Sequence, residues 1–98
     1  MTLTSKQRAY LKGLAMNIEP IFQIGKSNLT TEITTAIEES FNTRELIKIT
    51  VLKNASDDPK AMAETIAERT KSTVVQVIGR KIVLYKENKK HKKIELPK

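Results

Sequence analysis

The sequence contains no cysteine, which excludes disulfide bonds and cysteine-based zinc sites. This absence is compatible with a reducing cytosol, so we expect a cytoplasmic protein. Long apolar segments are also lacking, because the longest uninterrupted apolar run is four residues, at positions 82–85. Such a run cannot span a membrane, and residues 1–20 have no continuous apolar core of the kind found in signal peptides. We therefore expect no membrane partner.

Features of enzymes and metal centres are scarce too. The one histidine, His91, lies among four lysines, whereas a catalytic histidine needs an orienting partner and a pocket. Asp57 and Asp58 are adjacent, but helix capping explains at least one of them. The chain has neither the GxxxxGK[ST] phosphate loop nor a His/Asp/Glu cluster with metal-ligand spacing. We predict a protein that is not an enzyme and that holds no cofactor and no metal.

What is present is a small and strongly basic domain. The 98 residues are 39% apolar, enough for one modest core, and three glycines and three prolines are too few for a low-complexity chain. The net charge of +7 is one-sided: residues 1–70 hold nine basic and nine acidic residues, but residues 71–98 hold nine basic and two acidic ones. This asymmetry indicates a polyanionic partner, nucleic acid before others. The alternative is a tail that only aids solubility.

The hydrophobic pattern predicts seven elements in the order α-β-α-β-α-β-β. Helix starts are marked by the capping-box pair Thr4 and Gln7, by Thr30, and by Asp58 followed by Pro59. The expected helices cover residues 4–17, 30–44 and 57–71, the expected strands residues 21–25 and 45–53, and a hairpin residues 72–86 with its turn at 79–80.

This order predicts a two-layer α/β domain with a four-stranded mixed sheet. A strand–helix–strand unit implies parallel neighbours, and the closing hairpin adds an antiparallel pair. In the strand at 45–53, one face carries Ile47, Ile49 and Val51 and the other carries Leu46, Lys48, Thr50 and Leu52. This alternation suggests that helices cover one sheet face and that the other is partly open. We assign residues 1–88 to the domain and residues 89–98 to a basic tail, mobile or extended.

The segment IGKSNLT, at positions 24–30, joins an expected strand to an expected helix. Helix N-termini present unpaired N–H groups, Gly25 permits close backbone approach, and Lys26 adds charge. Asn28 is a residue type that tolerates the left-handed conformation. These parts suit a phosphate-binding turn, although any strand-to-helix turn needs a flexible residue. Tyr85 could stack on a base, but a place in the core is the stronger interpretation.

Four stretches together resemble a known family: LKGLA at 11–15, IEPIFQIGKSNLT at 18–30, ELIKITV at 45–51 and VQVIGRKIVLYK at 75–86. They occur in the order found in the CRM domain (chloroplast RNA splicing and ribosome maturation), in its stand-alone bacterial YhbY-type form. The resemblance extends from about Ser5 to Pro97. It implies a fold similar to the C-terminal domain of translation initiation factor three and RNA binding as the function.

The resemblance also implies partners and a binding loop. Bacterial members of the family are associated with large-subunit precursors, so the expected partners are precursor ribosomal RNA and pre-ribosomal particles, bound by a monomer. The family's GxxG loop is similar in role to that of KH domains, which clamps a nucleic-acid backbone. Here asparagine replaces the last glycine, and its side chain is expected to obstruct the closest phosphate approach. The loop positions are Gly25, Lys26, Ser27 and Asn28.

We therefore predict an RNA-binding protein of large-subunit assembly. Two alternatives remain open at this point: a protein-interaction module that docks on a ribosomal protein or assembly factor, and a general nucleic-acid binder that includes DNA among its ligands. Besides the loop, the expected RNA-binding residues are the basic side chains of the hairpin, the last strand and the tail: Arg80, Lys81, Lys86, Lys89, Lys90, Lys92 and Lys93.

Overall fold

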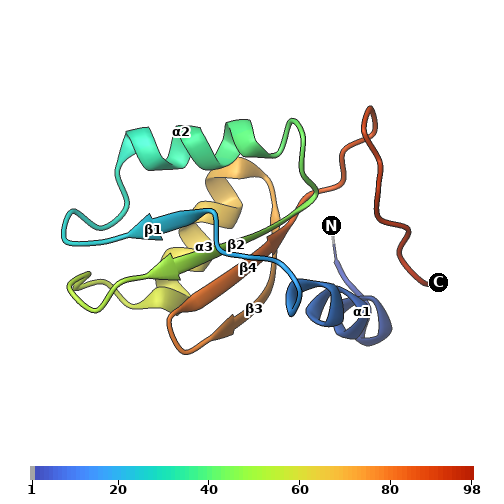
Figure 1. The fold of residues 1–98 in the computed structure, drawn as a ribbon, viewed down its shortest axis with the longest axis horizontal. Helices are drawn as coiled ribbons and strands as arrows, with labels where there is room; N and C mark the ends of the chain where they lie inside the picture. The colour runs from blue at the N-terminus through green and yellow to red at the C-terminus, as the bar shows by residue number, and fades with distance from the viewer. Residues whose placement is uncertain (1) are drawn as a thin grey trace.

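A computed structural model describes residues 2–98 and contains the seven elements in the predicted order (Figure 1). The three helices are α1 (Ser5–Ala15), α2 (Thr31–Ser40) and α3 (Pro59–Thr70). The four strands are β1 (Phe22–Ile24), β2 (Leu46–Val51), β3 (Thr73–Ile78) and β4 (Lys81–Tyr85). Within residues 2–98, none of the helices has the length and apolar character needed to cross a membrane.

The predicted helix starts are confirmed. Thr4 and Gln7 form a reciprocal capping box, in which the Gln7 backbone N–H donates to Thr4 Oγ1 at 3.1 Å and the Thr4 N–H donates to Gln7 Oε1 at 3.0 Å. Thr30 caps α2 and Asp58 caps α3. At its other end α3 stops at Lys71, whose φ of 57° places it in the left-handed conformation that ends many helices.

The sheet is mixed and four-stranded, as predicted, and its strand order is β1-β2-β4-β3. β1 pairs with β2 in parallel, while β4 is antiparallel to both β2 and β3. The hairpin between β3 and β4 turns at Gly79, where φ is 55°. This topology brings three connections to one end of the sheet, here called the loop end: residues 25–30, residues 52–58 and the hairpin turn (Figure 1).

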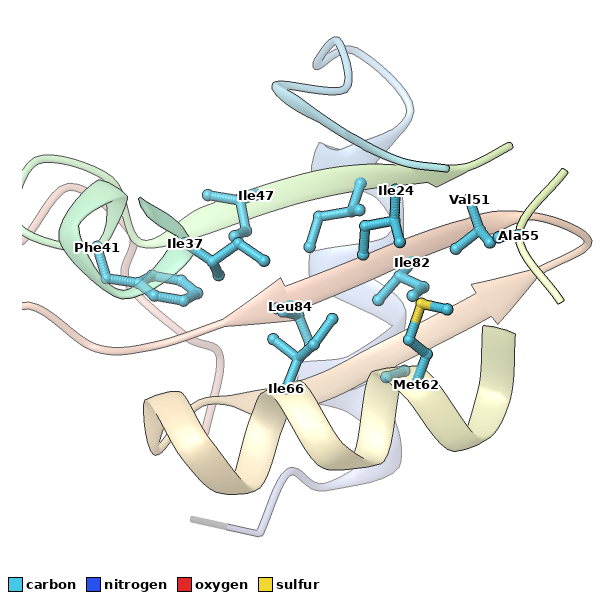
Figure 2. Packing of buried hydrophobic residues seen from close by; sticks show 12 residues of the cluster. Ile24, Ile37, Phe41, Ile47, Val51, Ala55, Met62, Ile66, Ile82 and Leu84 are labelled. Carbon is cyan, nitrogen blue, oxygen red and sulfur yellow. The ribbon is translucent and has the colours of Figure 1, made fainter. Parts of the chain in front are cut away.

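The main core lies between one sheet face and the helices α2 and α3 (Figure 2). The predicted alternation in β2 is confirmed, because Ile47, Ile49 and Val51 are buried here and Lys48 and Thr50 are not. The same cluster contains Ile37 of α2, Phe41 at the C-cap of α2, and Ile66 of α3. Burial of these side chains, at about 25 cal/mol per Å² of apolar surface, is the main force that holds the helices on the sheet.

The opposite sheet face is partly covered by α1. A second cluster joins Leu11 and Ala15 of α1 to Val75, Val83 and Tyr85 of the sheet. Arg8 fastens α1 to β3, because its guanidinium donates to the carbonyls of Val74 and Val75 at 2.7 and 2.6 Å, beside an irregularity in the strand pairing. The loop-end half of this face stays open around Lys48, Gln76, Ile78 and Lys81.

The C-terminal segment, for which we expected a mobile or extended form, packs against the rest of the domain. Ile94 and Leu96 pack against the second cluster, and the Gln7 side chain donates to the Pro97 carbonyl at 3.1 Å. These contacts cross the boundary that we placed at residue 88. The segment therefore forms part of the hydrophobic packing on the α1 face of the sheet.

Candidate nucleic-acid interface

The 25–28 loop is a tight turn between β1 and α2. The Asn28 backbone N–H donates to the Gly25 carbonyl at 2.8 Å, and Asn28 has a φ of 56°, which confirms the expected left-handed conformation. The side chains of Lys26 and Ser27 are exposed. Gly25 lies against the β2–α3 connection, since a Cβ added there would meet Asn54 Oδ1 at 3.4 Å. The turn is thus packed beside the next loop of the loop end.

The Asn28 side chain joins these two loops. Its Nδ2 donates to Ser56 Oγ at 3.1 Å, and its Oδ1 accepts a hydrogen bond from the Asp57 N–H at 3.0 Å. We expected this side chain to obstruct a phosphate, but both of its polar atoms are occupied by the β2–α3 connection. Asparagine therefore takes the left-handed turn and adds a cross-link that glycine could not make.

The start of α2 lies directly beside the turn. Thr30 Oγ1 accepts from the Ile33 N–H at 3.2 Å, and an open hollow runs along residues 23–28 to Thr30 and Ile33. The positive end of the helix dipole faces this hollow and favours an anion, whereas Glu32 in the first turn opposes one. The attraction for a phosphate must therefore come from basic side chains as well as from the backbone.

Basic side chains do gather at the loop end. Lys26, Arg80 and Lys81 were predicted, and the exposed Lys53 of the β2–α3 connection joins them, although sequence reasoning missed it. Arg80 is anchored by a hydrogen bond of 3.2 Å from Nη1 to the Leu52 carbonyl. The position of Lys53 carried one usable signal. It comes two residues after β2, which is parallel to β1, and parallel neighbours terminate at the same end of a sheet.

The remaining predicted residues lie at the other end of the sheet, here called the tail end. The structure therefore separates them from the 25–28 loop, in a molecule whose longest extent is 39 Å. Lys86 has a structural contact there, since its Nζ donates to the Thr70 carbonyl at the end of α3, at 3.0 Å. The others are exposed side chains of the segment that follows β4: Lys89, Lys90, Lys92 and Lys93.

Glu45 holds the segment after β4 in place at the tail end. Nothing in the sequence indicated this role. The residue is only 4% exposed, and its carboxylate accepts from the backbone N–H groups of Asn88, Lys93 and Ile94 at 2.9, 2.6 and 2.8 Å. Burial by itself raises the pKa of Glu45, but the three N–H donors and the charge of Lys92 outweigh it, so the pKa lies below its ordinary value of 4.5. Glu45 is therefore ionised at neutral pH.

The structure also places three other candidate residues, Tyr85, His91 and Asp58. Tyr85 is 1% exposed within the second cluster, so the core interpretation is confirmed and base stacking is not available to it. Burial, together with the nearby carboxylates of Glu45 and Glu87, raises the pKa of Tyr85 to about 12. His91 is exposed, and Asp58 is a helix cap. Among residues 2–98, no group of His, Asp and Glu side chains could hold a metal ion.

Comparison with known proteins gives consistent matches along most of the chain. The CRS1/YhbY (CRM) domain family matches residues 3–86. The "Probable RNA-binding protein YqeI" of Bacillus subtilis is 44% identical over 95 residues, covering 97% of this chain and 99% of that protein. An "RNA-binding protein" of Haemophilus influenzae is 36% identical over 97 residues, covering 99% and 97%. The solution structure of the hypothetical protein SAV1595 from Staphylococcus aureus has a TM-score of 0.83 at 52% identity, covering 98% of this chain and 100% of that one.

The cross-link made by Asn28 can be tested by two substitutions. Asn28→Gly keeps the positive φ but loses both side-chain hydrogen bonds, so we expect the free energy of unfolding to fall by about 1 kcal/mol. Asn28→Val adds the strain of a β-branched residue at positive φ and should cost about 2–3 kcal/mol. Urea denaturation measures both, with the exposed Ser27→Ala as a control that should not change stability. An Asn28→Gly variant as stable as the parent would show that the cross-link contributes nothing.

The ionised Glu45 predicts a loss of stability in acid. Because its folded-state pKa is lowered, the stabilisation is complete above pH 4.5 and is lost as the pH falls through the folded-state pKa. Glu45→Gln should be less stable than the parent at pH 7, and the difference should shrink below pH 4.5. Urea denaturation at several pH values measures this, with the exposed Glu95→Gln as the matched control. A difference independent of pH down to pH 2 would contradict the assignment.

Proposed function

Because the chain belongs to the CRS1/YhbY (CRM) domain family, we propose that it is a non-enzymatic protein that binds RNA. The observation that carries this proposal is the match of nearly the full chain to relatives that are themselves named RNA-binding proteins. The charge distribution supports it independently, since the excess of basic residues suits a polyanion.

The loop end is the surface that we assign to the RNA backbone. Lys26 lies exposed on the turn beside the N-terminus of α2, and Lys53, Arg80 and Lys81 reach the same end from two other connections. Lysine and arginine contacts to phosphates position a nucleic acid without reading its sequence. The acidic Asp57 and Asp58 follow in the β2–α3 connection, and the Asp57 N–H is bonded to Asn28, so these carboxylates oppose a phosphate at that contact.

We further propose that the RNA is precursor ribosomal RNA of the large subunit, bound as a monomer within pre-ribosomal particles in the cytoplasm. The support is the resemblance to the stand-alone YhbY-type form of the family. The alternative of docking on a ribosomal protein or assembly factor has one favourable observation: the side chains of Met16 and Ile78, near the open sheet face, are 80% and 61% exposed. Exposed apolar side chains of this kind often mark protein contacts.

The two modes predict different responses to salt. If RNA binding neutralises about four phosphates, the slope of log affinity against log salt should be near −3, whereas a protein interface should give a shallow slope. Lys26→Ala should weaken binding by about three- to ten-fold and flatten the slope by about 1, with no change in melting temperature. Fluorescence anisotropy with a structured RNA measures this, and Lys6→Ala on α1 is the control. Normal binding by Lys26→Ala would remove the 25–28 loop from the interface.

The assignment to ribosome assembly is tested by sedimentation. We expect the protein to move with large-subunit precursors in a sucrose gradient at low salt, and to leave them as salt is raised because the contacts are electrostatic. Immunoblots of the fractions, from cells with the parent protein and with Lys26→Ala, measure this. Protein found only at the top of the gradient at low salt would contradict the assignment while leaving RNA binding in general untouched.

A further inference from the structure

We propose that residues 86–94, here called the basic loop, form a second RNA-contact site, held in shape by the side chains of Glu45 and Asn88. This inference rests on the proposed RNA binding and deepens it, because it gives the tail end a built site. The site lies at the end of the sheet opposite the 25–28 loop. Neither of the two residues that shape it is a basic residue expected to touch RNA.

Two side chains accept hydrogen bonds from the backbone N–H groups of the basic loop. The Glu45 carboxylate accepts the N–H groups of Asn88, Lys93 and Ile94, and Asn88 Oδ1 accepts those of Lys90 and His91 at 3.0 and 3.1 Å. The loop has no helix or strand of its own, so these hydrogen bonds replace the backbone–backbone hydrogen bonds of regular secondary structure. Its conformation is therefore fixed by side chains rather than by secondary structure.

The basic loop is also attached to the rest of the domain at several points. Asn88 Nδ2 donates to the carbonyls of Phe41 and Asn42, both at 2.9 Å, just after α2. The Lys86 N–H donates to the Glu45 carbonyl at 2.9 Å, and Ile94 packs into the second cluster. The loop is thus fastened before, within and after its lysines.

The charges of the basic loop remain available for a partner. Lys89, Lys90, Lys92 and Lys93 are exposed, and within residues 2–98 their one ion pair is between Lys92 Nζ and Glu87, at 3.7 Å. The negative charge of Glu45 is buried, and its carboxylate accepts hydrogen bonds from backbone N–H groups. Lysines on a fixed backbone lose less entropy on binding than lysines on a mobile tail, so the site is pre-organised.

The chemistry of this surface fits phosphates. Its apolar neighbours Ile94 and Leu96 pack against the second cluster, so the four exposed lysines dominate what the loop presents to a partner. A run of lysine ammonium groups suits the evenly spaced phosphates of RNA. A hollow with apolar side chains from α1 and β2 lies beside it, next to Lys93 and Ile94. The tail end and the loop end would then contact separate segments of one RNA.

The decisive variant is Glu45→Gln. Its higher net charge predicts tighter RNA binding, whereas the loss of order in the basic loop predicts weaker RNA binding. It changes the net charge from +7 to +8, so attraction by charge alone would strengthen RNA binding. Loss of the ordered loop should instead weaken it by about ten-fold and flatten the salt slope by about 2. The matched control is Glu95→Gln, which makes the same charge change at an exposed position and should bind as tightly as the parent or more tightly.

Two further variants keep the test independent of how well Glu45→Gln folds. Asn88→Ala leaves the charge unchanged and should weaken RNA binding in the same direction. The triple variant Lys89→Gln, Lys90→Gln, Lys93→Gln keeps Glu45 and Asn88 and should weaken binding at least as much. Hydrogen exchange of the Lys93 and Ile94 amides reports the loop itself, and it should become fast in Glu45→Gln but not in the triple variant.

The outcomes separate this proposal from the proposed function. Weaker RNA binding by Asn88→Ala and by the triple variant, with Glu95→Gln binding at least as tightly as the parent, supports the second site. If the parent binds RNA and the triple variant binds it equally well, the second site is wrong and RNA binding stands. The second site is also wrong if Glu45→Gln exchanges its amides quickly yet binds as tightly as Glu95→Gln. A parent that binds no RNA overturns both.

Discussion

The parallel pairing of β1 with β2 is the constraint on which the rest of this structure depends. Phe22 lies opposite Ile49 and Ile24 lies opposite Val51, so both strands terminate at the same end of the sheet. After each strand the chain must return through a helix. The starts of α2 and α3 are therefore neighbours at the loop end. Asn28 can reach Ser56 across nearly thirty positions of sequence only because this pairing aligns the two connections.

The α1 face of the sheet shows a different way of building a surface. There the chain after β4 forms no further strand, and a single carboxylate, Glu45, gathers the backbone N–H groups of three residues from it. A buried charge is costly unless it is well hydrogen-bonded, and these donors provide that compensation. The result places a concentrated set of lysines on a defined backbone, at the end of the domain away from the 25–28 loop.

Sequence reasoning succeeded where the determining signals are local. Thr4, Thr30 and Asp58 identify helix starts within four residues of themselves, and the preference of Asn28 for positive φ is a property of that residue alone. It failed where the partner is remote. Glu45 looks like an ordinary exposed residue before a strand, because its donors lie more than forty positions later. The lysines of a basic surface could be identified, but their division between two ends of the sheet requires the topology.

The hydrogen bond from the Gln7 side chain to the Pro97 carbonyl brings the first helix and the last residues together. Both ends of the described chain consequently lie near the tail end, as Figure 1 shows, and far from the 25–28 loop. A purification tag or fluorescent protein fused at either terminus would therefore crowd the basic loop and leave the 25–28 loop clear. For the same reason a short linker between positions 97 and 2 could close the chain into a ring, with new termini opened on the opposite side of the molecule.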